Sequence, residues 1–260
     1  MRWSTVAGAA LWLSVAGCGS SPSKHMDAGT DGGLDGTTIV DAVQDTMENT
    51  VLVHGTVSEA TNARRIAGAR VCIVDRPEIP CATTDANGAY DLTMPAWTAE
   101  VDIAFNVTAA GHLGFTGLVH EMPGSVTWLS AQLYDDAGAT NMLAKAGFTY
   151  PAGGKAFVAL SVFKGSGGAA EGLTVSSSPA GTPVYFDKNG SPDPTLTAIT
   201  TNAYLLIGNL APGTVEITPS DPKCMPTSLA TGGWASSKPN TIAGKTAPDS
   251  MTDMTVICQF

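Results

Sequence analysis

Three side chains with oxygen donors, Asp187, Asn189 and Asp193, lie within seven residues around an Asn-Gly pair. Carboxylate and amide oxygens gathered around a turn are ligands that a hard cation such as Ca²⁺ accepts. The spacing therefore marks a candidate calcium or ligand loop. An Asn-Gly turn with acidic neighbours at a loop tip explains the same residues without any ion, and it is the favoured interpretation.

Cys18 follows a short apolar segment, Thr5 to Val15, and two small residues. A positive charge stands near the start, and the apolar run is too short to span a bilayer. This pattern resembles the signal of bacterial lipoproteins, in which the cysteine is acylated and becomes the mature N-terminus. The resemblance implies that residues 1–17 are removed and that Cys18 carries the membrane anchor. It also implies the outer membrane, facing the periplasm or the surface, because Gly19 stands where a retention signal has Asp.

The other four cysteines form an even set, Cys72, Cys81, Cys224 and Cys258, for which three pairings exist. Pairing Cys72 with Cys81 and Cys224 with Cys258 keeps each bond within one expected domain. An exported chain meets an oxidising compartment, where such bonds persist. We therefore expect two disulfides. A Cys/His metal site is disfavoured because the sequence has no Cys-x-x-Cys.

Trp234 is flanked by glycines in a stretch expected to be a loop. An indole in that setting is suited to stacking on a sugar ring, which makes Trp234 a candidate for glycan binding. A tryptophan packed back over the edge of a sandwich is the more common arrangement and remains the alternative.

Nothing in the sequence points to catalysis or to nucleic acid. It has no His-Glu-x-x-His and no Gly-x-Ser-x-Gly, so neither a zinc peptidase nor a serine hydrolase has a starting motif. The chain carries 23 acidic against 13 basic residues, a net charge of −10, whereas a phosphate backbone requires clustered Lys and Arg. We expect no enzymatic activity, no catalytic residue, no resident metal or other cofactor, and no nucleic-acid partner.

Residues 18–49 are rich in Gly and Asp, and the part from Pro22 to Asn49 has six acidic residues against one lysine. Like charges extend such a segment, and it has too few apolar residues to bury. We expect a disordered acidic tether between Cys18 and the folded part.

The remainder of the chain has the composition of a β protein. Short runs rich in Val, Ile, Thr and Tyr alternate with Gly, Pro, Asn and Asp clusters, which predicts strands. The predicted strands are Val51–Val57, Arg70–Val74, Ala89–Thr93, Glu100–Ala109, Ser125–Leu133, Ala156–Phe163, Leu173–Ser177, Val184–Phe186, Leu196–Thr200, Ala203–Ile207, Thr214–Pro219 and Thr252–Cys258. One short helix is expected near Thr140 to Ala146.

An internal repeat predicts two related domains. Gly68 to Val71 is echoed by Gly172 to Val175, and Thr84 to Tyr90 is echoed by Thr200 to Tyr204. We expect two tandem β-sandwiches of the prealbumin-like (Ig-like) kind, at residues 50–135 and 153–260. The linker at 136–152 contains the helix.

The first domain resembles a known family. His54 to Val57, Ile66 to Val71 and Thr84 to Leu92 are similar to the pattern of carboxypeptidase regulatory-like domains. The resemblance implies a seven-stranded prealbumin-like sandwich in a structural, adhesive or accessory role, and it carries over no catalytic residue.

Together these features predict a lipid-anchored extracytoplasmic protein that acts as a non-enzymatic binding or structural module. It would be held to the membrane by its acyl anchor and display loops to an envelope protein or a polysaccharide. An accessory subunit of an envelope enzyme or transport complex is the alternative.

Overall fold

The computed structural model of the chain describes residues 50–121, 129–226 and 232–260. These residues form strands and one helix, which confirms the all-β prediction. The elements are β1 (Thr50–Glu59), β2 (Arg70–Ile73), β3 (Ala82–Thr83), β4 (Ala89–Pro95), β5 (Val101–Thr108), β6 (Gly114–Glu121), β7 (Ala131–Leu133), α1 (Asp136–Lys145), β8 (Ala156–Lys164), β9 (Val175–Ser178), β10 (Thr182–Phe186), β11 (Pro192–Asp193), β12 (Tyr204–Leu210), β13 (Gly213–Pro219), β14 (Cys224–Pro226), β15 (Trp234–Ala235), β16 (Ile242–Thr246) and β17 (Ser250–Cys258). The predicted signal, Cys18 and the tether lie outside the described residues.

Strands β1 to β7 build a first sandwich. Its two layers follow the orders β4-β1-β7 and β3-β2-β5-β6. Period-two alternation sets the buried face: on β4, Tyr90, Leu92 and Met94 are buried, whereas Asp91 and Thr93 are exposed. The buried residues of both layers meet in one apolar core.

Strands β8 to β17 build a second sandwich. One layer follows the order β11-β10-β12-β8-β17, with β14 beside β17, and the other follows β15-β16-β13-β9. Alternate residues of β8, Val158, Leu160 and Val162, point into the core between these layers.

The two sandwiches repeat the same hydrogen bonds. Val57 N–H donates to Gly88 O, and Val162 N–H donates to Ala203 O. Two further hydrogen bonds of the first sandwich recur in the second. Ile66 N–H donates to Val57 O, as Ala170 N–H donates to Val162 O. Gly68 N–H donates to Thr84 O, as Gly172 N–H donates to Ile199 O. Strands β1, β4 and β7 thus correspond to β8, β12 and β17. The repeated pattern supports the predicted duplication, and the domain boundaries stay a prediction.

The echoed tyrosines are not equivalent in the two sandwiches. The matched hydrogen bonds align Gly88 with Ala203, and therefore Tyr90 with Leu205. Tyr90 is 4% exposed in the first core, whereas Tyr204 is 44% exposed on the outer face of β12. The sequence echo is therefore one residue out of register with the strands, and a one-residue slip moves a side chain to the opposite face.

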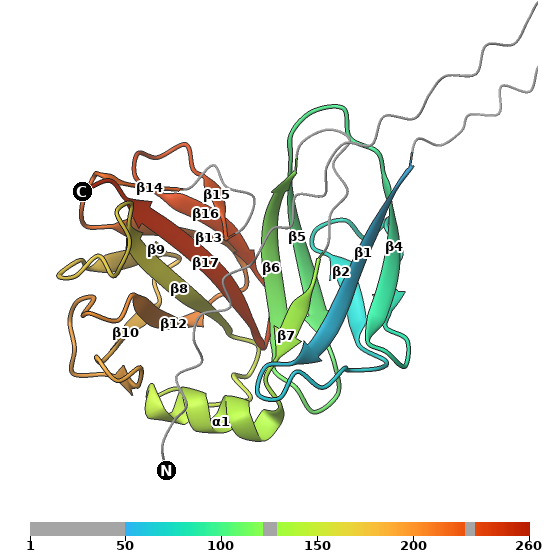
Figure 1. Cartoon of the computed structure of the whole chain (residues 1–260), viewed down its shortest axis with the longest axis horizontal. Coiled ribbons are helices and arrows are strands. Elements are labelled where there is room, and N and C mark those ends of the chain that lie inside the picture. The colour runs from blue at the N-terminus through green and yellow to red at the C-terminus, as the bar shows by residue number, and fades with distance from the viewer. Residues whose placement is uncertain (1–49, 122–128, 227–231) are drawn as a thin grey trace, which may run out of the picture. The chain divides into compact units, whose positions relative to one another are not determined.

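A direct strand pairing joins the sandwiches. β17 runs parallel to β6, with Ser250 opposite Gly114 and Thr252 opposite Thr116. The hydroxyls of Thr116 and Ser250 lie 3.1 Å apart and are fully buried. One ten-stranded sheet therefore runs from the second sandwich into the first, as the neighbouring β17 and β6 arrows of Figure 1 show.

The join is also packed. Ala104 and Leu118, on β5 and β6, point away from the first core and belong to the core of the second sandwich. Lys245 on β16 forms an ion pair with Asp75, with nitrogen and oxygen 2.7 Å apart. Strand β6 is consequently covered on both faces, and β5 is covered on its outer face at Ala104.

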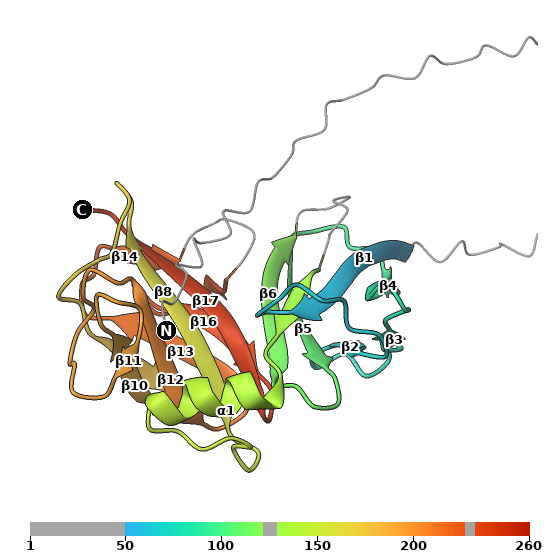
Figure 2. The same ribbon diagram turned by 60° about the horizontal axis from the view of Figure 1, so that its bottom comes forward.

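Helix α1 covers part of the second sandwich. The carboxylate of Asp135 accepts a hydrogen bond from Gly138 N–H at 2.7 Å and caps the helix, and Lys145 stands in its last turn. Leu143 packs with Phe157 of β8 and Leu206 of β12. Figure 2 shows the helix lying across these strands. The predicted helix is confirmed, and it begins four residues earlier than expected because Asp135 supplies the cap.

The predicted strands differ from the structure in several places, and the short strands β3, β11, β14 and β15 were not predicted. β6 was not predicted, because burial on both faces removes the alternation that marks a strand. β16 was not predicted either, since Gly244 and Lys245 break its apolar run. Leu196–Thr200 forms no strand; Thr200 Oγ1 instead donates to Phe186 O at 2.7 Å within a loop. Of the predicted strand Ser125–Leu133, only β7 falls within the described residues.

We predict that Leu118→Ala lowers the free energy of unfolding by about 2–4 kcal/mol, because Leu118 is 3% exposed in the shared packing. Leu52→Ala is the matched control: Leu52 is 44% exposed on β1, and its truncation should cost less than about 0.5 kcal/mol. Urea unfolding measures both. Equal free energies of unfolding for the two variants would show that the packing of Leu118 into the second core does not stabilise the protein.

Candidate functional site

The four cysteines described by the structure form two disulfides. Cys72 is bonded to Cys81, and Cys224 is bonded to Cys258. This confirms the predicted pairing within each sandwich. Cys224 lies on β14, directly opposite Cys258 of β17. Both residues of this second pair are fully buried.

The candidate calcium loop forms a tight turn between β10 and β11. Asp187 Oδ1 accepts hydrogen bonds from the backbone N–H groups of Asn189 and Ser191, each at 2.9 Å. These hydrogen bonds, of which the one from Ser191 has the largest effect, hold the pKa of the Asp187 carboxyl below its usual range. The carboxylate thus already has partners within its own turn.

Asp193 is the third residue of the predicted calcium loop, and its carboxylate also accepts hydrogen bonds from a residue close to it in the chain. Its Oδ1 accepts from the hydroxyl of Thr195 at 2.7 Å and from Thr195 N–H at 2.9 Å. The hydroxyl bond is the main reason that the pKa of Asp193 lies below its usual range, while the nearby charge of Asp187 acts in the opposite direction.

The first sandwich contains the same turn. Asp85 Oδ1 accepts from Asn87 N–H and Ala89 N–H, each at 2.8 Å, and Gly88 stands where Gly190 stands in the other turn. Both glycines have positive φ, which this turn requires and which glycine adopts without strain. The sequence carries a signal of this recurrence, since Asp-x-Asn-Gly occurs both at Asp85 and at Asp187. Their recurrence favours a structural turn at Asp187, and the calcium site stays a prediction.

Trp234 lies at the join between the sandwiches. Its indole N–H donates to Val119 O of β6 at 3.1 Å, and its half-buried ring packs against the second core. Gly232 N–H donates to Leu118 O beside it. The stretch around Trp234 therefore continues along the edge of β6 beyond the β17 pairing. Stacking of Trp234 on a sugar stays a prediction.

Two of the described histidines, His54 and His120, lie beside carboxylates. His54 on β1 contacts Asp91 on β4. His120 Nδ1 lies 2.8 Å from Asp102, which is the main reason that the pKa of His120 is raised, and its Nε2 lies 3.4 Å from Glu100. Within the described ranges no group of three or more His, Cys, Asp or Glu side chains is arranged to hold a metal ion.

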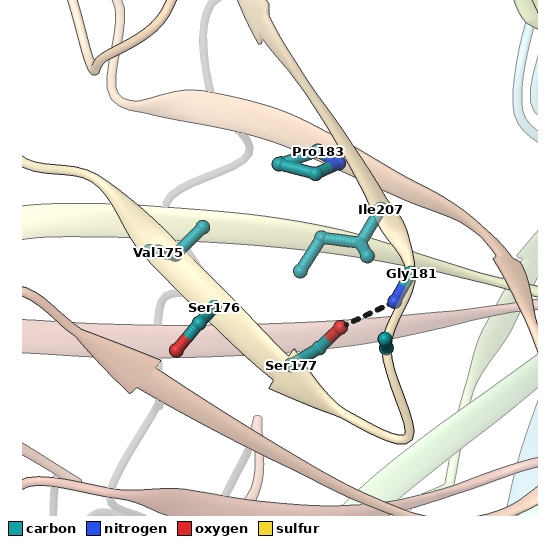
Figure 3. A pocket seen from close by; sticks show the side chains of 7 residues that line it. Val175, Ser176, Ser177, Gly181, Pro183 and Ile207 are labelled. Carbon is teal, nitrogen blue, oxygen red and sulfur yellow. Dashed lines mark hydrogen bonds between the residues drawn. The ribbon is translucent and has the colours of Figure 1, made fainter.

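A small cavity of about 230 Å³ opens between β9 and the β10–β12 pair. Figure 3 shows Val175, Pro183 and Ile207 facing into it, with Ser177 Oγ accepting a hydrogen bond from Gly181 N–H. Cavities that hold small-molecule ligands are usually larger, about 300–1,000 Å³.

A second hollow of about 270 Å³ lies on the first sandwich, where β3 turns into β4. Its lining comprises Thr83, Asp85, Ala89, Tyr90 and Asp91. Four of these residues fall within Thr84 to Leu92, the segment that carries the family resemblance, but that pattern does not indicate a hollow.

No protein-family model matches the sequence, and no curated protein matches it. Among solved structures, the chain is similar to the TIE protein of Bacillus anthracis, with 8% identity and a TM-score of 0.27, over 81% of this chain and 34% of that one. A streptococcal ancillary pilin shows 12% identity and a TM-score of 0.25, over 82% and 64% of the two chains. BcpA, the major pilin subunit of Bacillus cereus, shows 10% identity and a TM-score of 0.25, over 81% and 99%. The chain spans about a third of the first of these proteins, and likenesses this distant carry no conclusion about its role.

We predict that replacing the second disulfide by Cys224→Ala with Cys258→Ala costs about 2–4 kcal/mol, since the bond closes a loop over 34 residues. The matched pair Cys72→Ala with Cys81→Ala opens a loop over only nine and should cost less. Urea unfolding compares them. Four reactive thiols in the non-reduced protein would contradict both bonds.

We predict that calcium at about 1 mM leaves the melting temperature unchanged, because a ligand that binds the native state would raise it. The oxygens of Asp187 already serve Asn189 and Ser191. A rise in melting temperature that Asp187→Asn abolishes would establish the calcium site instead.

Proposed function

We propose that the chain is a non-enzymatic, lipid-anchored module of the bacterial envelope that presents its β-sandwich surfaces to a protein partner. In this account Cys18 carries the acyl anchor, the acidic segment up to residue 49 is the spacer, and both sandwiches are carboxypeptidase regulatory-like domains. The observation that carries the proposal is a β-sandwich structure with two disulfides, which follows a lipoprotein-type signal in the sequence.

The location is supported by the cysteine chemistry. Structural disulfides form and persist outside the reducing cytoplasm. The described part of the chain contains no helix with the length and hydrophobicity that crossing a membrane requires. Acylation would supply the attachment, since acyl chains bury about 0.8 kcal/mol per methylene.

A binding role is supported by how the polar groups are used. The Asp85 and Asp187 carboxylates accept backbone N–H groups of their own turns, and Trp234 donates to β6. Ser177 in the cavity of Figure 3 accepts from Gly181. These groups hold the surface in shape, which is what a recognition module requires.

We predict that the chain incorporates labelled palmitate and sediments with membranes, and that Cys18→Ser abolishes both, because the anchor is a single side chain. Cys72→Ser with Cys81→Ser is the control, since it removes two cysteines and should leave the label in place. A Cys18→Ser chain that remains labelled and membrane-bound would contradict the anchor.

In-cell crosslinking followed by mass spectrometry separates the possible roles. One dominant protein partner recovered from envelopes would support the proposal. Recovery with a complete enzyme or transport complex would make the chain its accessory subunit, and retention only on wall or capsule polysaccharide would contradict a protein partner.

A further inference from the structure

The first sandwich has an open sheet edge. β4 is seven residues long, and within the described residues it pairs only with β1. Because Gly88 O accepts from Val57 N–H, alternate residues of β4 direct their backbone groups toward β1. The groups of Asp91 and Thr93 therefore face away from the sheet. Such an edge is a template on which another strand can pair.

The second sandwich shows what occupies the same edge when it is covered. β12 corresponds to β4, and β10 pairs antiparallel with it, Val184 opposite Leu206 and Thr182 opposite Gly208. By the matched hydrogen bonds, Leu206 corresponds to Asp91 and Gly208 to Thr93. The repeat thus pairs a strand with the positions that β4 leaves open.

β10 also closes the gap between the two layers. Tyr185 lies opposite Leu205, is buried in the second core, and its hydroxyl accepts a hydrogen bond from Val175 N–H at 3.1 Å. One aromatic side chain therefore lies between the layers and bonds to the edge of the facing sheet.

In the first sandwich the equivalent place is hollow. Leu205 corresponds to Tyr90, and Tyr90 lines the hollow of about 270 Å³ between β3 and β4. Its volume is below that of usual small-ligand cavities. The open edge and the hollow lie together, as β10 and Tyr185 do in the other sandwich.

We propose that β4 binds an extended segment of a partner protein, which adds as an antiparallel strand and inserts an aromatic side chain beside Tyr90. This deepens the proposed function, on which it rests, by naming the surface that the partner uses. Recognition by strand addition takes affinity from main-chain hydrogen bonds and specificity from pockets for alternate side chains.

The charge at the edge indicates which segments fit. The carboxylates of Asp85 and Asp91 flank the hollow, and hydrogen bonds from Ala89 and Asn87 keep the pKa of Asp85 below its usual range. A segment with Lys or Arg next to its aromatic residue is therefore favoured over an acidic one. A second copy of this chain fits less well, because pairing β4 with β4 would leave Met94 in its own core and the hollow unfilled.

The test uses the full chain and a synthetic peptide with the sequence of Ala180–Phe186, which contains β10 and omits the acidic Asp187. Hydrogen exchange at the amides of Asp91 and Thr93 is measured with and without the peptide. We expect exchange to slow by roughly tenfold or more at saturating peptide, since strand pairing protects these amides. A peptide carrying Tyr185→Ser should protect them far less.

Two variants keep the test specific. Thr93→Pro removes an outward N–H, which an edge strand tolerates, and should abolish binding without changing the melting temperature. Thr93→Val keeps the N–H and should bind as the wild type does. No protection at millimolar peptide, equal binding to Thr93→Pro, or self-association of the chain that Thr93→Pro abolishes would each overturn the proposal. None of these outcomes bears on labelling at Cys18, so the anchor is judged separately.

Discussion

The pairing of β17 with β6 is the constraint on which the rest of the described structure depends. It joins two sandwiches through one ten-stranded sheet, and it buries the hydroxyls of Thr116 and Ser250 against each other. Once the strands are joined, Leu118 must pack into the second core, and the stretch around Trp234 follows the remaining edge of β6. A buried join of this kind fixes the two sandwiches as one body, unlike a flexible linker between independent domains.

The two sandwiches differ at one edge of their equivalent sheets. In the second, β10 covers the edge of β12, and Tyr185 lies between the layers. In the first, β4 ends its sheet beside a hollow at Tyr90. The edge of β4 lies beside this hollow, and an unpaired edge is a template on which another strand can pair. The difference between the copies is thus the basis for assigning the binding face to the first.

Local chemistry made much of the fold predictable. Runs of strand-forming residues predicted β4 and β8, the Asn-Gly pair at Asn189 predicted a turn, and the even cysteine set gave the two disulfides. The failures come from tertiary packing: β6 lost its alternation because both of its faces are buried, and Tyr204 echoed Tyr90 in sequence while lying on the opposite face. The hollow beside Tyr90 had no sequence signal, since it arises from a strand that the first copy lacks.

Differential scanning calorimetry of the wild-type chain tests the central claim most directly, because strands shared between two cores should make their unfolding cooperative. The account predicts one transition, in which the calorimetric enthalpy equals the van't Hoff enthalpy. Two separate transitions, each with the enthalpy of one sandwich, would show that the β6–β17 join does not couple them and would contradict the account.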